Sequence, residues 1–152
     1  MHEPLTPVTK KDGCLFEDGA DRGRVIVFGR DTGGAYGLME LTVAPSASSA
    51  GHGAHSHRDF EEAFLVRSGR LEFLLGHRLF TLEPGDFVRA PAGVRHGYRN
   101  ASGCDVDLLV SFTPGGFEEL FVKYSTAGLE PSASEGFMEE ATDRFGSHFE
   151  HA

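Results

Sequence analysis

The chain has 152 residues and a formal net charge of −9, with 23 acidic against 14 basic side chains. That length fits one domain with a core of its own. The negative charge argues against nucleic acid as a partner, because the phosphates would be repelled. The N-terminus has no apolar signal segment, and no apolar run approaches the ~18 residues of a membrane span. With only two cysteines, Cys14 and Cys104, the composition favours a reduced, cytoplasmic protein without a membrane partner.

Short β-rich runs separated by glycines fill most of the chain before the Pro114-Gly115-Gly116 segment. Turn signals recur about every 8–12 residues, which is typical of an antiparallel sandwich or barrel. The small, polar segment 44–54 is expected to be a loop over the barrel mouth. The expected strands span residues 24–28, 36–43, 62–66, 70–75, 78–82, 86–90, 95–100 and 106–112.

After Pro114-Gly115-Gly116 the apolar spacing becomes that of helices. One set recurs at i, i+3, i+4 and i+7, and a later set recurs every four residues: Phe117, Leu120, Phe121 and Tyr124, then Phe137, Ala141, Phe145 and Phe149. This spacing predicts two helices, and Ser132 with Glu135 fits a capping box ahead of the second. The helices are expected either to pack outside the barrel or to close one end of it.

Three histidines and one glutamate have the spacing of metal ligands. His55 and His57 are two residues apart, so on a strand both imidazoles point to the same face. Glu62 follows after four residues, a connection that suits a tight antiparallel turn returning the carboxylate beside the imidazoles. His96 is the candidate for the fourth ligand.

Two neighbours of these residues offer alternatives. Glu61 competes with Glu62, but the parity of Glu62 places Phe64 and Val66 on the barrel-lining face with it, and we therefore favour Glu62. His52 lies close to the cluster in sequence and is interpreted as a solvated loop histidine.

Two segments carry a family resemblance. Segment 55–69, HSHRDFEEAFLVRSG, resembles the first cupin motif: HxH, three or four residues, E, six residues, G. Segment 85–100, GDFVRAPAGVRHGYRN, resembles the second: G, five residues, PxG, two residues, H, three residues, N. Ser49 stands where the pattern has a glycine before the first motif. The tail 112–121 is similar to small single-barrel cupins of the quercetin-dioxygenase-like group.

This resemblance implies a mainly β fold, an antiparallel double-stranded β-helix (the cupin or jelly-roll barrel) with two C-terminal helices. It implies a single domain over residues 1–152, with the barrel core at about 24–113 and the helices at about 116–150. It also implies one divalent transition metal on His55, His57, Glu62 and His96. Fe(II) is favoured, and Mn, Ni, Co or Zn also suit three imidazoles and a carboxylate.

The resemblance implies dioxygenase-type oxidation of a small phenolic, enolic or polyketide-like substrate, in which Glu62 also takes the proton of the substrate hydroxyl. One alternative is a non-redox isomerase, cyclase or lyase that uses the metal as a Lewis acid. In that reaction Tyr98, on the same inward face as His96, would act as acid or base. The alternative interpretation of Tyr98 is an aromatic residue that only packs in the core. Another alternative is a cupin that binds a small molecule without catalysis.

The remaining predictions concern the pocket and the assembly. Pocket candidates chosen on strand parity and apolar character are Tyr36, Met39, Phe64, Phe73, Arg89 and Phe112. Arg89 would anchor an anionic substrate group from inside the barrel, whereas on the outer face, the placement we favour, it would be a surface charge. The apolar run from Val25 to Phe28 would invite pairing at a sheet edge. Small cupins dimerise through such strands, so the resemblance favours a homodimer, with burial inside the same chain as the alternative.

Overall fold

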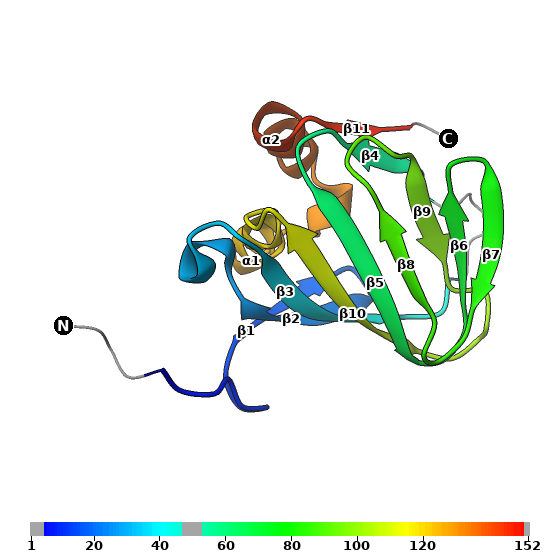
Figure 1. Cartoon of the computed structure of the whole chain (residues 1–152), viewed down its shortest axis with the longest axis horizontal. Coiled ribbons are helices and arrows are strands. Elements are labelled where there is room, and N and C mark those ends of the chain that lie inside the picture. The colour runs from blue at the N-terminus through cyan, green and yellow to red at the C-terminus, as the bar shows by residue number, and fades with distance from the viewer. Residues whose placement is uncertain (1–4, 47–52, 151–152) are drawn as a thin grey trace.

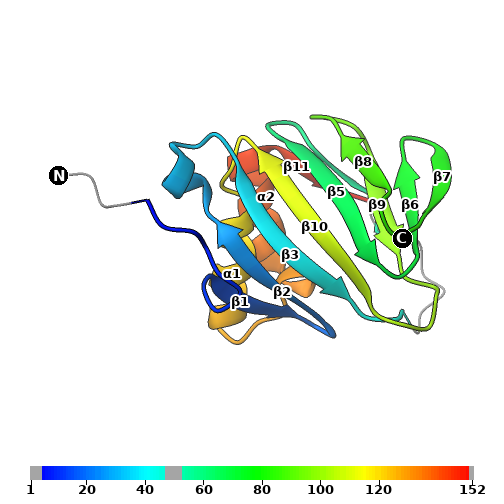
Figure 2. The ribbon, with the colours of Figure 1, turned by 60° about the horizontal axis from the view of Figure 1, so that its bottom comes forward.

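The computed structural model describes residues 5–46 and 53–150, and within them the strands form two antiparallel sheets (Figure 1, Figure 2). The larger sheet has six strands in the order β1 (Cys14–Asp18), β2 (Asp21–Val27), β3 (Gly37–Val43), β10 (Val106–Thr113), β5 (Glu61–Ser68) and β8 (Phe87–Ala90). The smaller has five, in the order β11 (Ser147–Phe149), β4 (His55–His57), β9 (His96–Arg99), β6 (Leu71–Leu75) and β7 (Arg78–Leu82). The expected mainly β fold with a double-stranded β-helix is confirmed.

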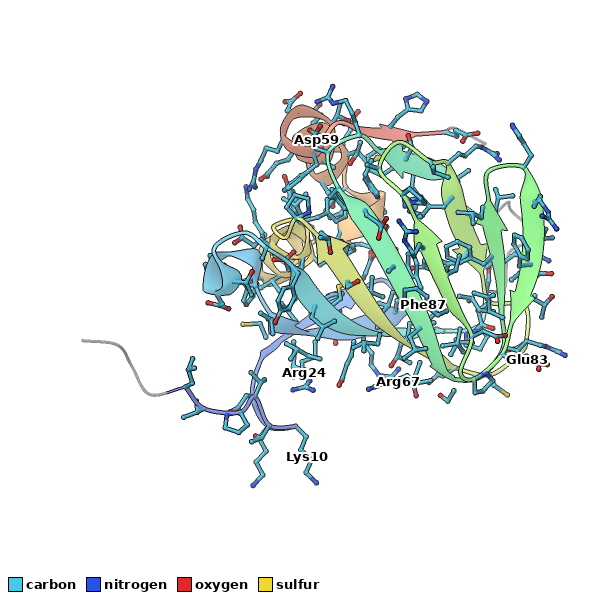
Figure 3. The ribbon with its side chains drawn as sticks, in the orientation of Figure 1. Lys10, Arg24, Asp59, Arg67, Glu83 and Phe87 are labelled. Atoms are coloured by element: carbon cyan, nitrogen blue, oxygen red, sulfur yellow. The ribbon has the colours of Figure 1, made fainter. Side chains whose placement is uncertain are left out.

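Strand alternation separates an apolar interior from a charged exterior. On β3 the side chains of Met39, Leu41 and Val43 are buried, while the residues between them are half-exposed. The outer face of the same sheet carries ion pairs instead. Figure 3 shows Arg24 and Arg67 projecting on the side away from the helices, where both pair with Glu40, at 2.8 Å and 3.6 Å.

The apolar strand β2 is not an edge strand. It pairs with β1 on one side and with β3 on the other. Of the two alternatives for this apolar run, burial inside the same chain is the one observed, because the preceding residues form a strand that pairs with β2. The predicted homodimer loses this support and stays a prediction.

Two helices follow the barrel strands, α1 (Glu118–Thr126) and α2 (Glu135–Phe145), and short 3-10 turns lie at η1 (Gly29–Thr32) and η2 (Pro131–Ala133). Both helices lie behind β1, β2 and β3 in Figure 2, on the side of the sheet opposite the Arg24 side chain. Rings of Phe117, Phe121 and Phe137 meet at centroid distances of 5.3–5.8 Å. The helices thus close one end of the barrel. No helix among the described residues is long and apolar enough to cross a membrane.

The second helix differs from its expected form at both ends. It begins after Ser134, whose side chain makes no capping hydrogen bond, and Ser132 instead bonds Asp18 on β1. The predicted capping box is therefore wrong. The helix ends at Phe145 and is capped by Gly146, whose φ of 62° suits a residue without a Cβ, so Phe149 falls on strand β11 and not on the helix.

Candidate metal centre and its cavity

The four predicted ligands come from both sheets. His55 and His57 lie on β4, and the strand register places His55 opposite His96 on β9. Glu62 lies on β5 in the other sheet, so the connection after His57 crosses between the sheets and is not the tight turn that the spacing suggested. Phe60 anchors this crossing, because its buried ring stacks on His57 at 4.3 Å between centroids. The carboxylate therefore faces the imidazoles across the interior.

One ligand atom from each of His55, His57, Glu62 and His96 lies within 4.8 Å of the others. Glu62 Oε2 is 3.0 Å from His96 Nε2 and 3.4 Å from His57 Nε2. His57, Glu62 and His96 are 2%, 6% and 1% exposed, while His55 is half-buried. Glu61, the alternative carboxylate, lies on the outer side and pairs with a surface arginine. The parity argument for Glu62 therefore agrees with the observed cluster.

Burial and mutual contacts set the charges in this cluster. Burial, reinforced by the positive potential of His96, lowers the pKa of His55 to about 4, so this ring is neutral at pH 7. Burial alone would raise the pKa of Glu62, but the contacts with His57 and His96 outweigh it and hold that pKa well below its usual range. Burial opposes the charge on His96, yet the Glu62 carboxylate raises its pKa. A divalent cation would therefore compete with a proton for this carboxylate–imidazole pair.

Each imidazole is oriented through its Nδ1 atom. His55 Nδ1 lies 2.7 Å from the carbonyl oxygen of Gly53, and His96 Nδ1 lies 2.9 Å from that of Val94. Because a carbonyl only accepts, these rings donate from Nδ1 and turn Nε2 toward the cluster. His57 Nδ1 contacts a side chain of the C-terminal strand instead.

The donor set and its environment fit a divalent transition metal. Among the described residues, His57 Nε2 is the buried side-chain nitrogen left without a hydrogen-bond partner. An unpaired buried polar atom is costly, and a metal bond would remove that cost. Three imidazole nitrogens and one carboxylate oxygen suit first-row transition metals. The four residues can thus hold a metal ion.

A cavity of about 360 Å³ adjoins the cluster. Its wall is mostly apolar and includes Met39, Leu41, Phe64, Phe117, Phe121, Phe137, Met138 and Phe149. Its polar lining consists of His55, His57, Glu62, Tyr98, Asp18, Ser132 and Glu150. Among the described lining residues none is Lys or Arg. Such a cavity suits an apolar or aromatic small molecule with few polar groups.

Tyr98 contributes a half-buried phenol to this cavity. It lies on β9, two residues after His96, and lines the cavity as its parity suggested. Burial raises the pKa of the phenol, and the carboxylates of Asp21 and Glu62 raise it further. Tyr98 therefore keeps its proton at neutral pH and can donate a hydrogen bond.

The predicted pocket residues fall into three groups. Met39 and Phe64 line the cavity. Phe73 and Phe112, both 0% exposed, are core residues behind the wall, where Phe73 lies parallel to the His96 ring at 6.4 Å and 7°. They support the site without lining the cavity.

Tyr36 and Arg89 are wrong as pocket residues. Tyr36 is 44% exposed and lies just before the first residue of β3, Gly37, so it does not share the inward face of Met39. Arg89 pairs across strands with Ala63 and donates to Glu61 at 2.5 Å, on the outer face of the sheet. The outer placement favoured for Arg89 is the observed one.

Sequence reasoning missed the part of the wall that comes from the C-terminal region. Phe117, Phe121, Phe137 and Phe149 had a helical signal, but nothing in their spacing said which surface they would cover. Segment 44–54, expected to cover the mouth, lies largely outside the described residues, as do Ser49 and His52.

Known proteins resemble the chain in sequence and fold. Residues 39–112 match the family model described as a cupin domain. The quercetin 2,3-dioxygenase of Bacillus subtilis (strain 168) is 32% identical over 139 residues, which cover 88% of this chain. The chain spans 39% of the length of that relative.

Solved structures share the fold at lower identity. KdgF from Halomonas sp. superposes with a TM-score of 0.65 at 16% identity, covering 77% of this chain and 100% of that chain. The polyketide cyclase RemF from Streptomyces resistomycificus superposes with a TM-score of 0.59 at 23% identity, covering 72% of this chain and 80% of that chain. At these identities the likeness concerns the fold.

Proposed function

This chain belongs to the cupin superfamily, and we propose that it is a metal-dependent oxidoreductase that adds dioxygen to a neutral phenolic or enolic small molecule. The cofactor is one divalent transition metal, with Fe(II) favoured, on His55, His57, Glu62 and His96. The similarity to a quercetin 2,3-dioxygenase supports this reaction class. A dioxygenase places both atoms of O2 in its products, so no external reductant is needed.

The observation that carries the proposal is the contact between the donor cluster and an aromatic cavity. His55, His57 and Glu62 belong to the same wall as Phe64, Phe117, Phe121, Phe137 and Phe149. Aromatic rings pack favourably against other rings in offset or edge-on arrangements. A flat substrate ring can therefore lie among the phenyl groups while one of its oxygens reaches the cluster.

The charge of the cavity points to a neutral substrate. Its acidic lining residues are Asp18, Glu62 and Glu150, and none of the described lining residues is cationic. A bound divalent ion would attract one enolate or phenolate oxygen. A second anionic group, such as a phosphate or carboxylate, would find no Lys or Arg among the described lining residues to pair with, and its desolvation would cost free energy.

The residues of the site have distinct roles in metal binding, proton transfer and substrate orientation. A bound metal supplies Lewis acidity toward a substrate oxygen and, as Fe(II) or Mn(II), electron exchange with dioxygen. Glu62, kept ionised by its histidine neighbours, would accept the proton of the substrate hydroxyl. The phenyl rings orient the substrate and exclude water from the reacting oxygen.

Tyr98 favours a second candidate, a non-redox cyclase, isomerase or lyase. Its half-buried phenol lines the cavity and keeps its proton. A proton donor beside a Lewis acid is what stabilisation of an enolate requires. In this reaction Tyr98 would protonate a substrate carbon or oxygen, and no dioxygen would be consumed.

The test combines metal content with oxygen uptake. Untagged protein is analysed by plasma mass spectrometry, loaded anaerobically with Fe(II), and assayed in an oxygen electrode with flavonols, catechols and enolic diketones. We expect O2 uptake with neutral substrates and much less with the carboxylated analogue of each. Glu62→Gln should abolish uptake, whereas Glu61→Gln, a change in the adjacent outward-facing residue, should leave it intact.

The competing functions give different results in the same experiment. Turnover that persists without O2 and disappears in Tyr98→Phe would support the non-redox reaction instead. Thermal stabilisation by a ligand without any turnover would indicate a binding protein. Equal uptake by Glu62→Gln and Glu61→Gln would contradict the assigned role of Glu62.

A further inference from the structure

The C-terminal strand lies directly beside the strand that carries two of the candidate ligands. β11 pairs antiparallel with β4, with Ser147 opposite His57 and Phe149 opposite His55 (Figure 1). The last strand of the chain is therefore built into the edge of the metal centre.

His57 is the ligand candidate whose Nδ1 contacts a side chain, that of Ser147, whereas Nδ1 of His55 and of His96 contacts a backbone carbonyl. The Ser147 Oγ lies 2.6 Å from His57 Nδ1, and both residues are buried, at 4% and 2% exposure. His55 and His96 are oriented by carbonyls two residues before them, whereas the partner of His57 comes from 90 positions further along the chain. The orientation of His57 thus depends on the C-terminal strand.

We propose that Ser147 is a positioning residue of the metal centre, which couples docking of the C-terminal strand to metal binding. The hydroxyl accepts from Nδ1 of His57 and holds Nε2, the atom left without a partner, 3.4 Å from the Glu62 carboxylate. The inference rests on the proposed metal centre, and it does not depend on whether the reaction is a dioxygenation.

The strand has enough other contacts to remain docked when the hydroxyl is removed. The carbonyl of Gly146 accepts from the Arg58 amide at 3.1 Å, and the Glu150 amide donates to Ala54 at 3.0 Å. Phe149 stacks on His55 at 5.9 Å between centroids. Ser147→Ala should therefore remove one hydrogen bond without undocking β11.

The strand pair also provides a matched control. Ser56 lies between the two histidines of β4 and pairs with His148, which is exposed. By alternation its side chain points away from the cluster. Ser56→Ala is thus the same chemical change on the other face of the same strand pair.

The experiment measures Co(II) binding by competition with a chelator and records the visible spectrum of the Co(II) protein. We expect Ser147→Ala to bind Co(II) about 10–100-fold more weakly than the parent, as is typical when an outer partner of a ligand is lost. Its visible bands should shift, because the orientation of one imidazole changes. Ser56→Ala should match the parent, and Ser147→Thr, which keeps the hydroxyl, should recover most of the affinity.

Hydrogen exchange tests the coupling directly, first in the parent protein and then in Ser147→Ala. Because coupling is reciprocal, Co(II) should slow exchange of the backbone amides of β11, and this protection should shrink in Ser147→Ala. Unchanged affinity and spectrum in Ser147→Ala, or no protection of β11 in the parent, would overturn the proposal and leave the metal centre standing. A parent protein that binds no Co(II) would overturn both.

Discussion

Glu118 is a buried carboxylate outside the metal centre. It is 0% exposed and accepts hydrogen bonds from the amides of Gly29, at 2.5 Å, and Gly116, at 2.8 Å. These bonds tie the start of α1 to η1 and to the turn before the helix. Glu118→Ala would leave one buried and one half-buried amide unpaired and should lower the free energy of unfolding by about 3 kcal/mol, measured by urea denaturation.

The adjacent residue is the control for this prediction. Glu119 pairs with Arg30 at 2.9 Å, and the arginine side chain is 61% exposed. An ion pair of this kind contributes little, so Glu119→Ala should cost less than about 1 kcal/mol. Equal losses in the two variants would show that the Glu118 carboxylate does not hold the turn.

At the same scale, strand parity explains which site residues could be predicted from the sequence. Alternation within a single strand was enough to predict the orientation of the HxH pair, of Glu62 and of Tyr98, each on its own strand. The structure places all of these side chains on the inner face. Tyr36 was predicted as a strand residue, but it lies before β3 begins and is exposed. Ser147 could not be found, because its contact with His57 depends on pairing between distant segments.

Between the elements, Glu140 on α2 joins the two helices that close the barrel. Its carboxylate accepts from Lys123 at 2.6 Å and Tyr124 at 3.0 Å on α1, and from Arg144 at 2.7 Å on its own helix. The Lys123 ammonium is the main reason that the pKa of Glu140 falls to about 2. A carboxyl with a depressed pKa stabilises the folded state above its unfolded pKa, and this contribution is lost as the pH falls through the folded value.

Glu140→Gln should therefore lower the free energy of unfolding by about 1 kcal/mol at pH 7. The difference from the parent should shrink between pH 4.5 and pH 2, the unfolded and folded pKa values. Urea titrations of both proteins at pH 7 and pH 3 measure it, with the exposed neighbour variant Glu139→Gln as control. A difference that stays constant over this range would contradict the ion-pair explanation.

The elements themselves were predictable to different degrees. Long runs with periodic hydrophobicity predicted β3, β10 and both helices. Strand β11 was missed because three residues are too few to show a period. The connection after His57 has the length of a hairpin turn, yet burial of Phe60 carries it across to the other sheet. Local spacing predicts an element, but tertiary burial decides what that element pairs with.

At the scale of the whole molecule, the candidate metal centre joins residues of the two sheets, because Glu62 comes from one and the three histidines from the other. A metal that binds only the folded chain should add about 2.7 kcal/mol at 100 times its dissociation constant. For a chain of this size that corresponds to a rise in Tm of about 5–10 °C. Calorimetry with Co(II), repeated after addition of a chelator, measures this shift.

Two variants decide whether the stabilisation arises at the centre. His55→Ala removes a candidate ligand on β4 and should abolish the rise in Tm. His148→Ala changes an exposed histidine on the adjacent strand β11 and should retain it. An equal rise in His55→Ala would place the bound ion elsewhere on the acidic surface. Loss of the rise in His55→Ala alone would place the stabilising ion at the cluster that includes His55.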